Sequence, residues 1–194
     1  MTGDEEDAPA ESQTSAGGLP GLIIVNTGDG KGKTTAALGL AMRAVGNRFR
    51  VAVIQYFKGQ WQPGEKKAAA YLPGLEFIPL GEGFTWTKTP AVHMAAMRAT
   101  WAKTQEVIMA GQHDVVILDE INYALATTSI PVHEVFTVHD VVDLLRRRPP
   151  QMHVVLTGRY AKPEIIEIAD LVTEMRLVKH PFDKGRRATR GIEF

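Results

Sequence analysis

The chain contains no cysteine, and this absence removes several classes of function. Without a thiol there is no disulfide, no thiolate metal site, no iron–sulfur cluster and no cysteine nucleophile. The 194 residues also carry no surplus of charge, because Lys+Arg and Asp+Glu each number 22. A balanced charge gives no support for nucleic acid as a partner, so a polyanion would have to be bound by locally placed cations.

Long apolar runs are also missing. No stretch of the sequence approaches the roughly 18 apolar residues that a membrane span needs, so we expect no membrane-bound form. The first residues, "MTGDEEDAPAESQTSAGG", are acidic and small, unlike the basic and apolar start of a signal peptide. We predict that residues 1–19 are a disordered acidic leader, or a tail that folds over a bound ligand. A cytoplasmic location fits these absences.

Residues 20–194 alternate short apolar runs with segments of helical periodicity. We predict strands at 21–28, 50–57, 75–80, 114–120, 152–159 and 171–178, and helices at 33–47, 91–111, 130–148 and 162–170. This alternation is typical of an α/β protein: a single three-layer α/β/α domain with a mostly parallel sheet. Ligands of such domains bind beyond the carboxyl ends of the strands.

The segment "TGDGKGKTTAALG" follows the first predicted strand and resembles a phosphate-binding loop. In the pattern G-x-x-x-x-G-K-[ST], the first glycine would stand at Thr27, but it stands at Gly28, so the loop is one residue shorter. Backbone N–H groups and the start of a helix can hold an anion here, with Lys33 as a cation. The predicted nucleotide-binding residues in this loop are Gly28, Asp29, Gly30, Lys31, Gly32, Lys33, Thr34 and Thr35.

The other residues expected in a nucleotide site come directly after later strands. "VVILDE" ends in Asp119 and Glu120, and a carboxylate there can hold Mg²⁺ directly or through water, opposite the Thr34 hydroxyl. One acid would meet the metal and the other would orient the metal or a water, but spacing does not decide which. Arg159 follows "HVVLT" and either reaches the phosphates or forms a surface salt bridge. We therefore expect ATP with Mg²⁺ (or Mn²⁺) as ligands.

The reaction is left open by these motifs. There is no kinase catalytic sequence such as H-R-D, and the six histidines form no metal-binding pair such as H-E-x-x-H. A reaction that needs no base from the protein therefore fits the sequence well.

Six motifs, taken in order, narrow the choice: "GLIIVNTGDGKGKTTAALG", "QYFKG…GE", "GFTW", "VVILDE", "LTGR" and "VKHPFDKG…GIEF". From about Gly21 to Phe194 the chain resembles the ATP:corrinoid adenosyltransferases of the RecA-like, P-loop type. The resemblance implies a RecA-like P-loop NTPase fold. It also implies transfer of the 5′-deoxyadenosyl group of ATP to Co(I) of a reduced corrinoid, with release of triphosphate, in adenosylcobalamin biosynthesis or salvage.

The same resemblance implies roles for individual residues. The short loop would hold the triphosphate as a leaving group, in an orientation unlike that in kinases, with Lys33 as a catalytic residue. Thr34 and Glu120 would contact the metal. Phe84 and Trp86 of "GFTW" would press on the lower face of the corrinoid and displace its axial base, which makes Co(II) easier to reduce. Without the resemblance, the two aromatic residues would be interpreted as covering the core.

The family also suggests a homodimer and an electron-donating reductase, such as a flavoprotein. Three other functions were weighed: a small-molecule kinase, a nucleotide-gated switch or corrinoid carrier, and a RecA-like DNA motor. The short loop and "GFTW" argue against the kinase. The D-x-H-x-x-G sequence with which carriers often bind cobalt is absent, and the neutral charge balance argues against the motor.

Overall fold

The computed structural model describes residues 19–57, 64–79 and 89–193. Its strands are β1 (Ile23–Thr27), β2 (Val51–Gln55), β3 (Leu75–Phe77), β4 (Val115–Asp119), β5 (His153–Thr157) and β6 (Leu171–Glu174). Its α-helices are α1 (Lys33–Gly46), α2 (Gly64–Ala68), α3 (Pro90–Ala110), α4 (Ile121–Ala126), α5 (Val138–Arg147) and α6 (Pro163–Ile168). Short 3₁₀ turns occur at Ala69–Tyr71, Val132–Glu134 and Pro181–Lys184. None of the helices in the described ranges is long and apolar enough to cross a membrane.

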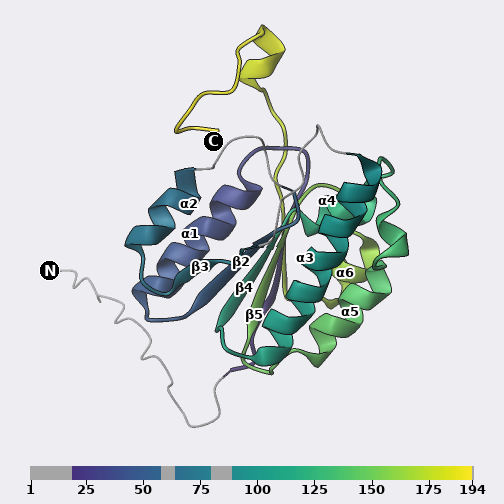
Figure 1. Cartoon of the computed structure of the whole chain (residues 1–194). Coiled ribbons are helices and arrows are strands. Elements are labelled where there is room, and N and C mark those ends of the chain that lie inside the picture. The colour runs from purple at the N-terminus through teal and green to yellow at the C-terminus, as the bar shows by residue number, and fades with distance from the viewer. Residues whose placement is uncertain (1–18, 58–63, 80–88, 194) are drawn as a thin grey trace, which may run out of the picture.

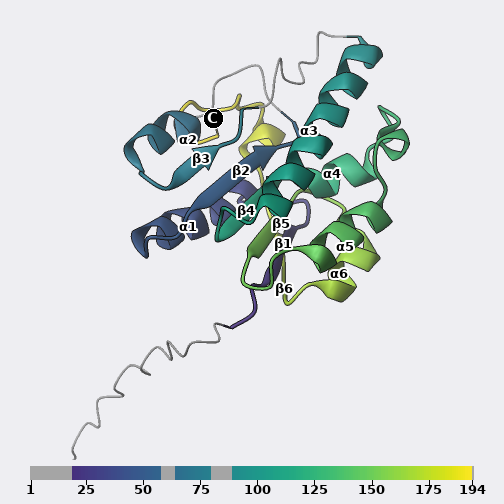
Figure 2. The same ribbon diagram turned by 60° about the horizontal axis from the view of Figure 1, so that its bottom comes forward.

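The six strands form one parallel sheet in the order β3-β2-β4-β5-β1-β6. Helix α1 covers one face, and α3, α4, α5 and α6 cover the other (Figures 1 and 2). The four central strands are almost fully buried, as expected of parallel strands with helices on both faces. The prediction of a three-layer α/β/α domain with a mostly parallel sheet is confirmed.

Two apolar cores lie on the two faces of the sheet. The smaller core packs Ala37 and Ala41 of α1 against β-branched residues such as Ile24 and Val51. The larger core contains Trp101 of α3, whose ring stacks on Phe136 with 4.6 Å between the centroids. Because small alanines face the sheet, α1 can lie close to it, and this fixes where the preceding loop meets the strands.

The elements differ from the prediction in several places, and helix α2 was not expected. The helix expected over 130–148 is a 3₁₀ turn followed by α5, because Thr137 and Asp140 form a capping box that starts a new helix. The last strand ends at Glu174 rather than Val178. Helix α4, which begins directly after Glu120, was not expected. All but the last residue of the predicted leader, 1–19, lies outside the described residues.

Candidate functional site

The loop between β1 and α1 lies at the carboxyl edge of the sheet, where a ligand of such a fold binds. Gly28 and Gly32 have φ angles of 90° and 111°, a backbone conformation that residues with a side chain rarely adopt. Gly30 is required for another reason, because a Cβ atom there would lie 2.7 Å from the carbonyl oxygen of Met175. The Gly30 N–H donates to that oxygen at 2.6 Å. The segment after β6 therefore packs directly on the loop.

Lys33 lies inside the curve of this loop, with only 8% of its surface exposed. Its Nζ atom donates to the carbonyl oxygens of Gly28 and Gly30, each at 2.7 Å. Burial lowers the pKa of Lys33, while the nearby Glu120 carboxylate opposes this shift. A buried ammonium group held by backbone carbonyls is a cation that can exchange these partners for phosphate oxygens.

A hydrogen-bonded network joins the loop to three strand ends. Asp119, the last residue of β4, is 4% exposed. Its Oδ1 atom accepts from the hydroxyl of Thr34 at 2.8 Å and from the hydroxyl of Thr157 at 2.7 Å. Its Oδ2 atom accepts from the side-chain amide of Gln55 at 3.3 Å. Asp119 is thus the acid that contacts Thr34, and it fixes the direction of the Thr34 hydroxyl.

Glu120 follows Asp119 in a left-handed backbone conformation, with a φ angle of 64°. Its N–H donates to the hydroxyl of Thr157 at 2.9 Å. Burial, followed by the neighbouring Asp119 charge, raises the pKa of Glu120, and the cations Lys33 and Arg159 partly counteract this. Its carboxylate has no hydrogen-bond donor within the described ranges. It is therefore the acid still available for a ligand.

Arg159 comes from the turn after β5 and reaches the loop at Asp29. Its Nε atom lies 3.9 Å from the Asp29 carboxylate, and its Nη2 atom donates to the Asp29 carbonyl at 3.4 Å. A cavity of about 420 Å³ lies at this point, lined by Asp29, Arg159, Glu174, Met175, Arg176 and Leu177. The arginine is therefore a salt-bridge partner of the loop and also lies beside a space that could receive a ligand.

The C-terminal segment also contacts the loop. Residues 178–193 extend beyond the body of the domain (Figure 1, yellow). Glu193 then pairs with Lys31, with 3.0 Å between Oε2 and Nζ. The Lys31 side chain is 64% exposed, so this pair lies on the outer side of the loop. The hydrogen bond from Lys31 lowers the pKa of Glu193.

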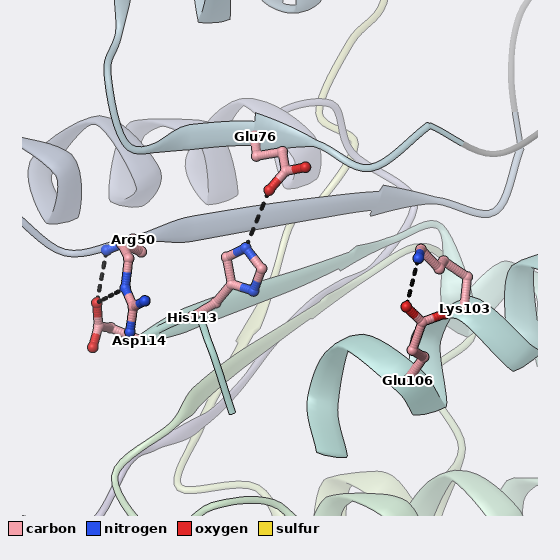
Figure 3. Close-up of polar contacts among 6 residues, drawn as sticks. All are labelled: Arg50, Glu76, Lys103, Glu106, His113 and Asp114. Carbon is pink, nitrogen blue, oxygen red and sulfur yellow. Dashed lines mark hydrogen bonds and ion pairs between the residues drawn. The ribbon is translucent and has the colours of Figure 1, made fainter. Parts of the chain in front are cut away.

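Three polar pairs elsewhere in the described chain lie away from this edge. Figure 3 shows Arg50 with Asp114, His113 with Glu76, and Lys103 with Glu106, at distances of 3.9, 3.3 and 2.7 Å. Arg50 and Asp114 precede β2 and β4, so they lie at the amino ends of these strands. No group of three or more His, Cys, Asp or Glu residues that could hold a metal occurs in the part of the chain that the structure describes. Ion pairs near the surface contribute little to stability.

The structure brings most of the predicted site residues together. Residues 28–34, Asp119, Glu120 and Arg159 meet at one edge of the sheet, and Thr35 lies exposed on the first turn of α1. Phe84 and Trp86 lie outside the described residues. Gln55 and Thr157 were not predicted. The available signal was a polar residue at the end of each of two apolar strands, "VAVIQ" and "HVVLT".

Comparison with solved structures finds matches of low sequence identity. One is the flagellar accessory protein FlaH from Methanocaldococcus jannaschii, at 17% identity and a TM-score of 0.48, covering 82% of this chain and 73% of that chain. Another is the RadB recombinase, at 13% identity and a TM-score of 0.47, covering 83% of this chain and 77% of that chain.

Comparison of sequences finds much closer relatives. A corrinoid adenosyltransferase of Sinorhizobium sp is 47% identical over 178 residues, covering 90% of this chain and 80% of that protein. Those of Escherichia coli K12 and Salmonella typhimurium LT2 are 43% and 41% identical, each covering 90% of this chain and 86% of the relative. The family model "ATP:corrinoid adenosyltransferase BtuR/CobO/CobP" matches residues 20–194. Because this family model and these relatives cover almost the whole chain, the chain belongs to the ATP:corrinoid adenosyltransferase family.

Proposed function

We propose that this chain transfers the 5′-deoxyadenosyl group of ATP to Co(I) of a reduced corrinoid and releases triphosphate. The observation that carries the proposal is the short glycine loop around buried Lys33, in a chain of this family. Nucleotide binding alone would also fit a kinase or a switch. Family membership over residues 20–194 favours adenosyl transfer over both.

The reaction balances without a proton transfer. The electron pair of Co(I) forms the bond to C5′ of the ribose, and the bond between C5′ and its phosphate oxygen breaks. The electrons of that bond leave on triphosphate, and cobalt is formally oxidised to Co(III). Because the nucleophile carries no proton, the protein has to position the two substrates and stabilise the departing charge. The cations, backbone N–H groups and hydroxyls at the loop suit this task.

Lys33 has the largest part in this scheme. Its two hydrogen bonds to loop carbonyls hold the ammonium group inside the loop. A triphosphate in the loop offers charged oxygens in place of those neutral acceptors, and charge-assisted hydrogen bonds are stronger. The ammonium group would then lie where negative charge accumulates as the leaving group departs.

The residues present also fit a magnesium ion. The Thr34 hydroxyl donates a hydrogen bond to Asp119, so the lone pairs of its oxygen remain available to a metal. Glu120 supplies a carboxylate. Oxygen ligands of this kind suit Mg²⁺ and Mn²⁺, which are usually completed by substrate phosphates and water. We propose Thr34 and Glu120 as the metal contacts and Asp119 as the residue that orients Thr34. The bound ion would neutralise charge on the triphosphate.

The corrinoid side of the site involves Phe84 and Trp86. Pressed on the lower face of the corrinoid, they would displace its axial base and make Co(II) easier to reduce. A flavoprotein reductase would supply the electron in the cytoplasm, and the enzyme would act as a homodimer. Trp86→Ala should then lose activity when Co(II) must be reduced in the assay, but keep it when chemically reduced cob(I)alamin is supplied. Equal losses in both assays would contradict this role.

The function itself is tested by an anoxic absorption time course. Purified protein is mixed with MgATP and cob(I)alamin, and the spectrum of a light-sensitive alkylcobalamin should appear only when ATP is present. Lys33→Ala should abolish it. If ATP binds but no cobalt–carbon bond forms, the phosphate site stands and adenosyl transfer is excluded.

A further inference from the structure

Thr157 occupies a central place at the carboxyl edge of the sheet. It is the last residue of β5, and β5 lies between β1, which leads into the phosphate loop, and β4, which ends in Asp119. Its side chain is fully buried. A buried hydroxyl at this position cannot serve as a solvated surface group, so its hydrogen bonds have to be accounted for.

Both hydrogen bonds of this hydroxyl go to the two acids of the site. It donates to Oδ1 of Asp119 at 2.7 Å and accepts from the backbone N–H of Glu120 at 2.9 Å. The same Asp119 oxygen accepts from the Thr34 hydroxyl. One side chain of β5 thus contacts one acid through its carboxylate and the other through its backbone.

The hydrogen bond to Glu120 is made to a residue whose backbone conformation is unfavourable. Glu120 has φ and ψ angles of 64° and 18°, a left-handed conformation that costs free energy for a residue with a side chain. Such a conformation persists only when its surroundings hold it. The Thr157 hydroxyl accepts a hydrogen bond from the N–H of Glu120, and α4 begins immediately after Glu120.

The next residue of the same turn leaves room for the Glu120 side chain. A Cβ atom at Gly158 would lie 2.8 Å from the backbone nitrogen of Tyr123 and 3.2 Å from Oε2 of Glu120. The end of β5 therefore holds the Glu120 backbone with one residue and makes space for its carboxylate with the next. That carboxylate is close enough to Lys33 and Arg159 for their charges to act on it.

We propose that Thr157 is a positioning residue for adenosyl transfer, whose hydroxyl keeps Glu120 in its left-handed turn and Asp119 in its bond with Thr34. This inference rests on the proposed roles of Thr34 and Glu120 as metal contacts. Residues that orient metal ligands from behind typically change activity by about 10–100-fold when their hydrogen bonds are removed. Loss of the hydroxyl would also leave the partly buried N–H of Glu120 without this acceptor.

A matched pair of variants isolates the hydroxyl. Thr157→Ser and Thr157→Ala both lose the methyl group and differ only in the hydroxyl, while Thr157→Val keeps the shape. With chemically reduced cob(I)alamin, we expect Ser to keep kcat within about threefold of the native chain. Ala and Val should lower kcat by about tenfold or more and raise the Mg²⁺ concentration needed for half-maximal rate. Equal kcat values for Ser and Ala would overturn the proposal, and thermal unfolding shows which variants fold.

A double-mutant cycle with Glu120→Gln separates positioning from a general structural effect. If Thr157 acts through Glu120, adding Thr157→Ala to Glu120→Gln should lower kcat by less than about twofold more. If the two losses multiply fully while Glu120→Gln alone is impaired, positioning through Glu120 is overturned and the metal role of Glu120 stands. If Glu120→Gln alone has no effect, the metal role fails, and the positioning role fails with it.

Discussion

The phosphate loop has an inner and an outer side, and each carries a lysine. Lys33 points inward, is 8% exposed and bonds two loop carbonyls. Lys31, two residues earlier, points outward with 64% of its side chain exposed and pairs with Glu193 of the C-terminal segment. The two residues have the same chemistry and nearly the same place in the sequence. Burial separates their roles.

The physical difference lies in hydration. A buried ammonium group has lost its water and depends on the acceptors that the protein or a ligand supplies, so phosphate oxygens are strong partners for Lys33. An exposed ammonium group keeps its water and is screened by salt, so its pair with Glu193 gains little. We therefore expect the inner side of the loop to supply most of the binding energy for phosphate. The outer side adds only a weak ion pair at the surface.

The largest loss of activity should come from replacing Lys33, with Lys31 as the matched comparison. Lys33→Ala should weaken ATP binding and lower the rate of adenosyl transfer by about 100-fold or more, because a preorganised cation at the leaving group is lost. Lys31→Ala should lower ATP affinity by less than about tenfold, since the lost charge is hydrated. Isothermal titration with MgATP and the cob(I)alamin assay measure both. Equal losses for the two variants would refute the distinction between the inner and outer sides.

The pH dependence of stability tests the burial of Glu120 on the inner side of the loop. Burial and the Asp119 charge raise the pKa of Glu120 above 4.5, so the folded protein holds this proton more tightly than the unfolded chain. The free energy of unfolding should therefore fall as the pH rises from 4.5 through the raised pKa. Glu120→Gln, which cannot ionise, should be more stable than the native chain at neutral pH, and this gain should fade as the pH approaches 4.5.

The same variant should lose activity by about tenfold or more, because a neutral amide is a poorer ligand for Mg²⁺. Thermal unfolding between pH 5 and 8, combined with initial rates, measures both effects. A variant that is less stable than the native chain at neutral pH would contradict the assigned burial cost.

Gly30 tests the contact between the loop and the segment after β6. A Cβ atom there would meet the backbone of Met175 and Arg176 at 2.7 and 2.8 Å, so Gly30→Ala should destabilise the fold by about 1–3 kcal/mol. Gly39→Ala is the matched control, because Gly39 lies exposed in α1 with nothing within 4 Å of a Cβ atom. It should stabilise by about 0.5–1 kcal/mol. Urea unfolding compares the two, and similar changes for both would refute the contact.

The smallest effect should come from Glu193→Gln. Removing this carboxylate frees Lys31 and takes a negative charge away from the outer side of the loop. ATP should bind tighter by less than about threefold, and the gain should disappear at high salt. Titration with MgATP at low and high ionic strength measures this change. A large loss of ATP affinity would show instead that Glu193 holds Lys31 in place for binding.

Much of this molecule could be predicted from the sequence because its signals are local. Apolar runs alternating with helical periodicity indicate the parallel sheet, and "GKGKT" after a strand predicts a phosphate loop with Lys33 inside it. The ordered motifs indicated the corrinoid adenosyltransferase family, and the comparisons with relatives confirm it. Each of these signals is carried by short segments, within which the residues are close together in the chain.

Contacts between distant residues were decided only by the tertiary structure. Spacing did not decide which of Asp119 and Glu120 meets the metal. Only the packing of β4 against α1 brings Asp119 to Thr34, which lies 85 residues earlier in the chain. The role of Thr157 depends on β5 lying between β4 and β1, an order that the sequence does not state. Gly30 is required by a segment about 145 residues later, where the backbone of Met175 approaches it. Local patterns determine which elements form, but the packing of the sheet determines which side chains meet.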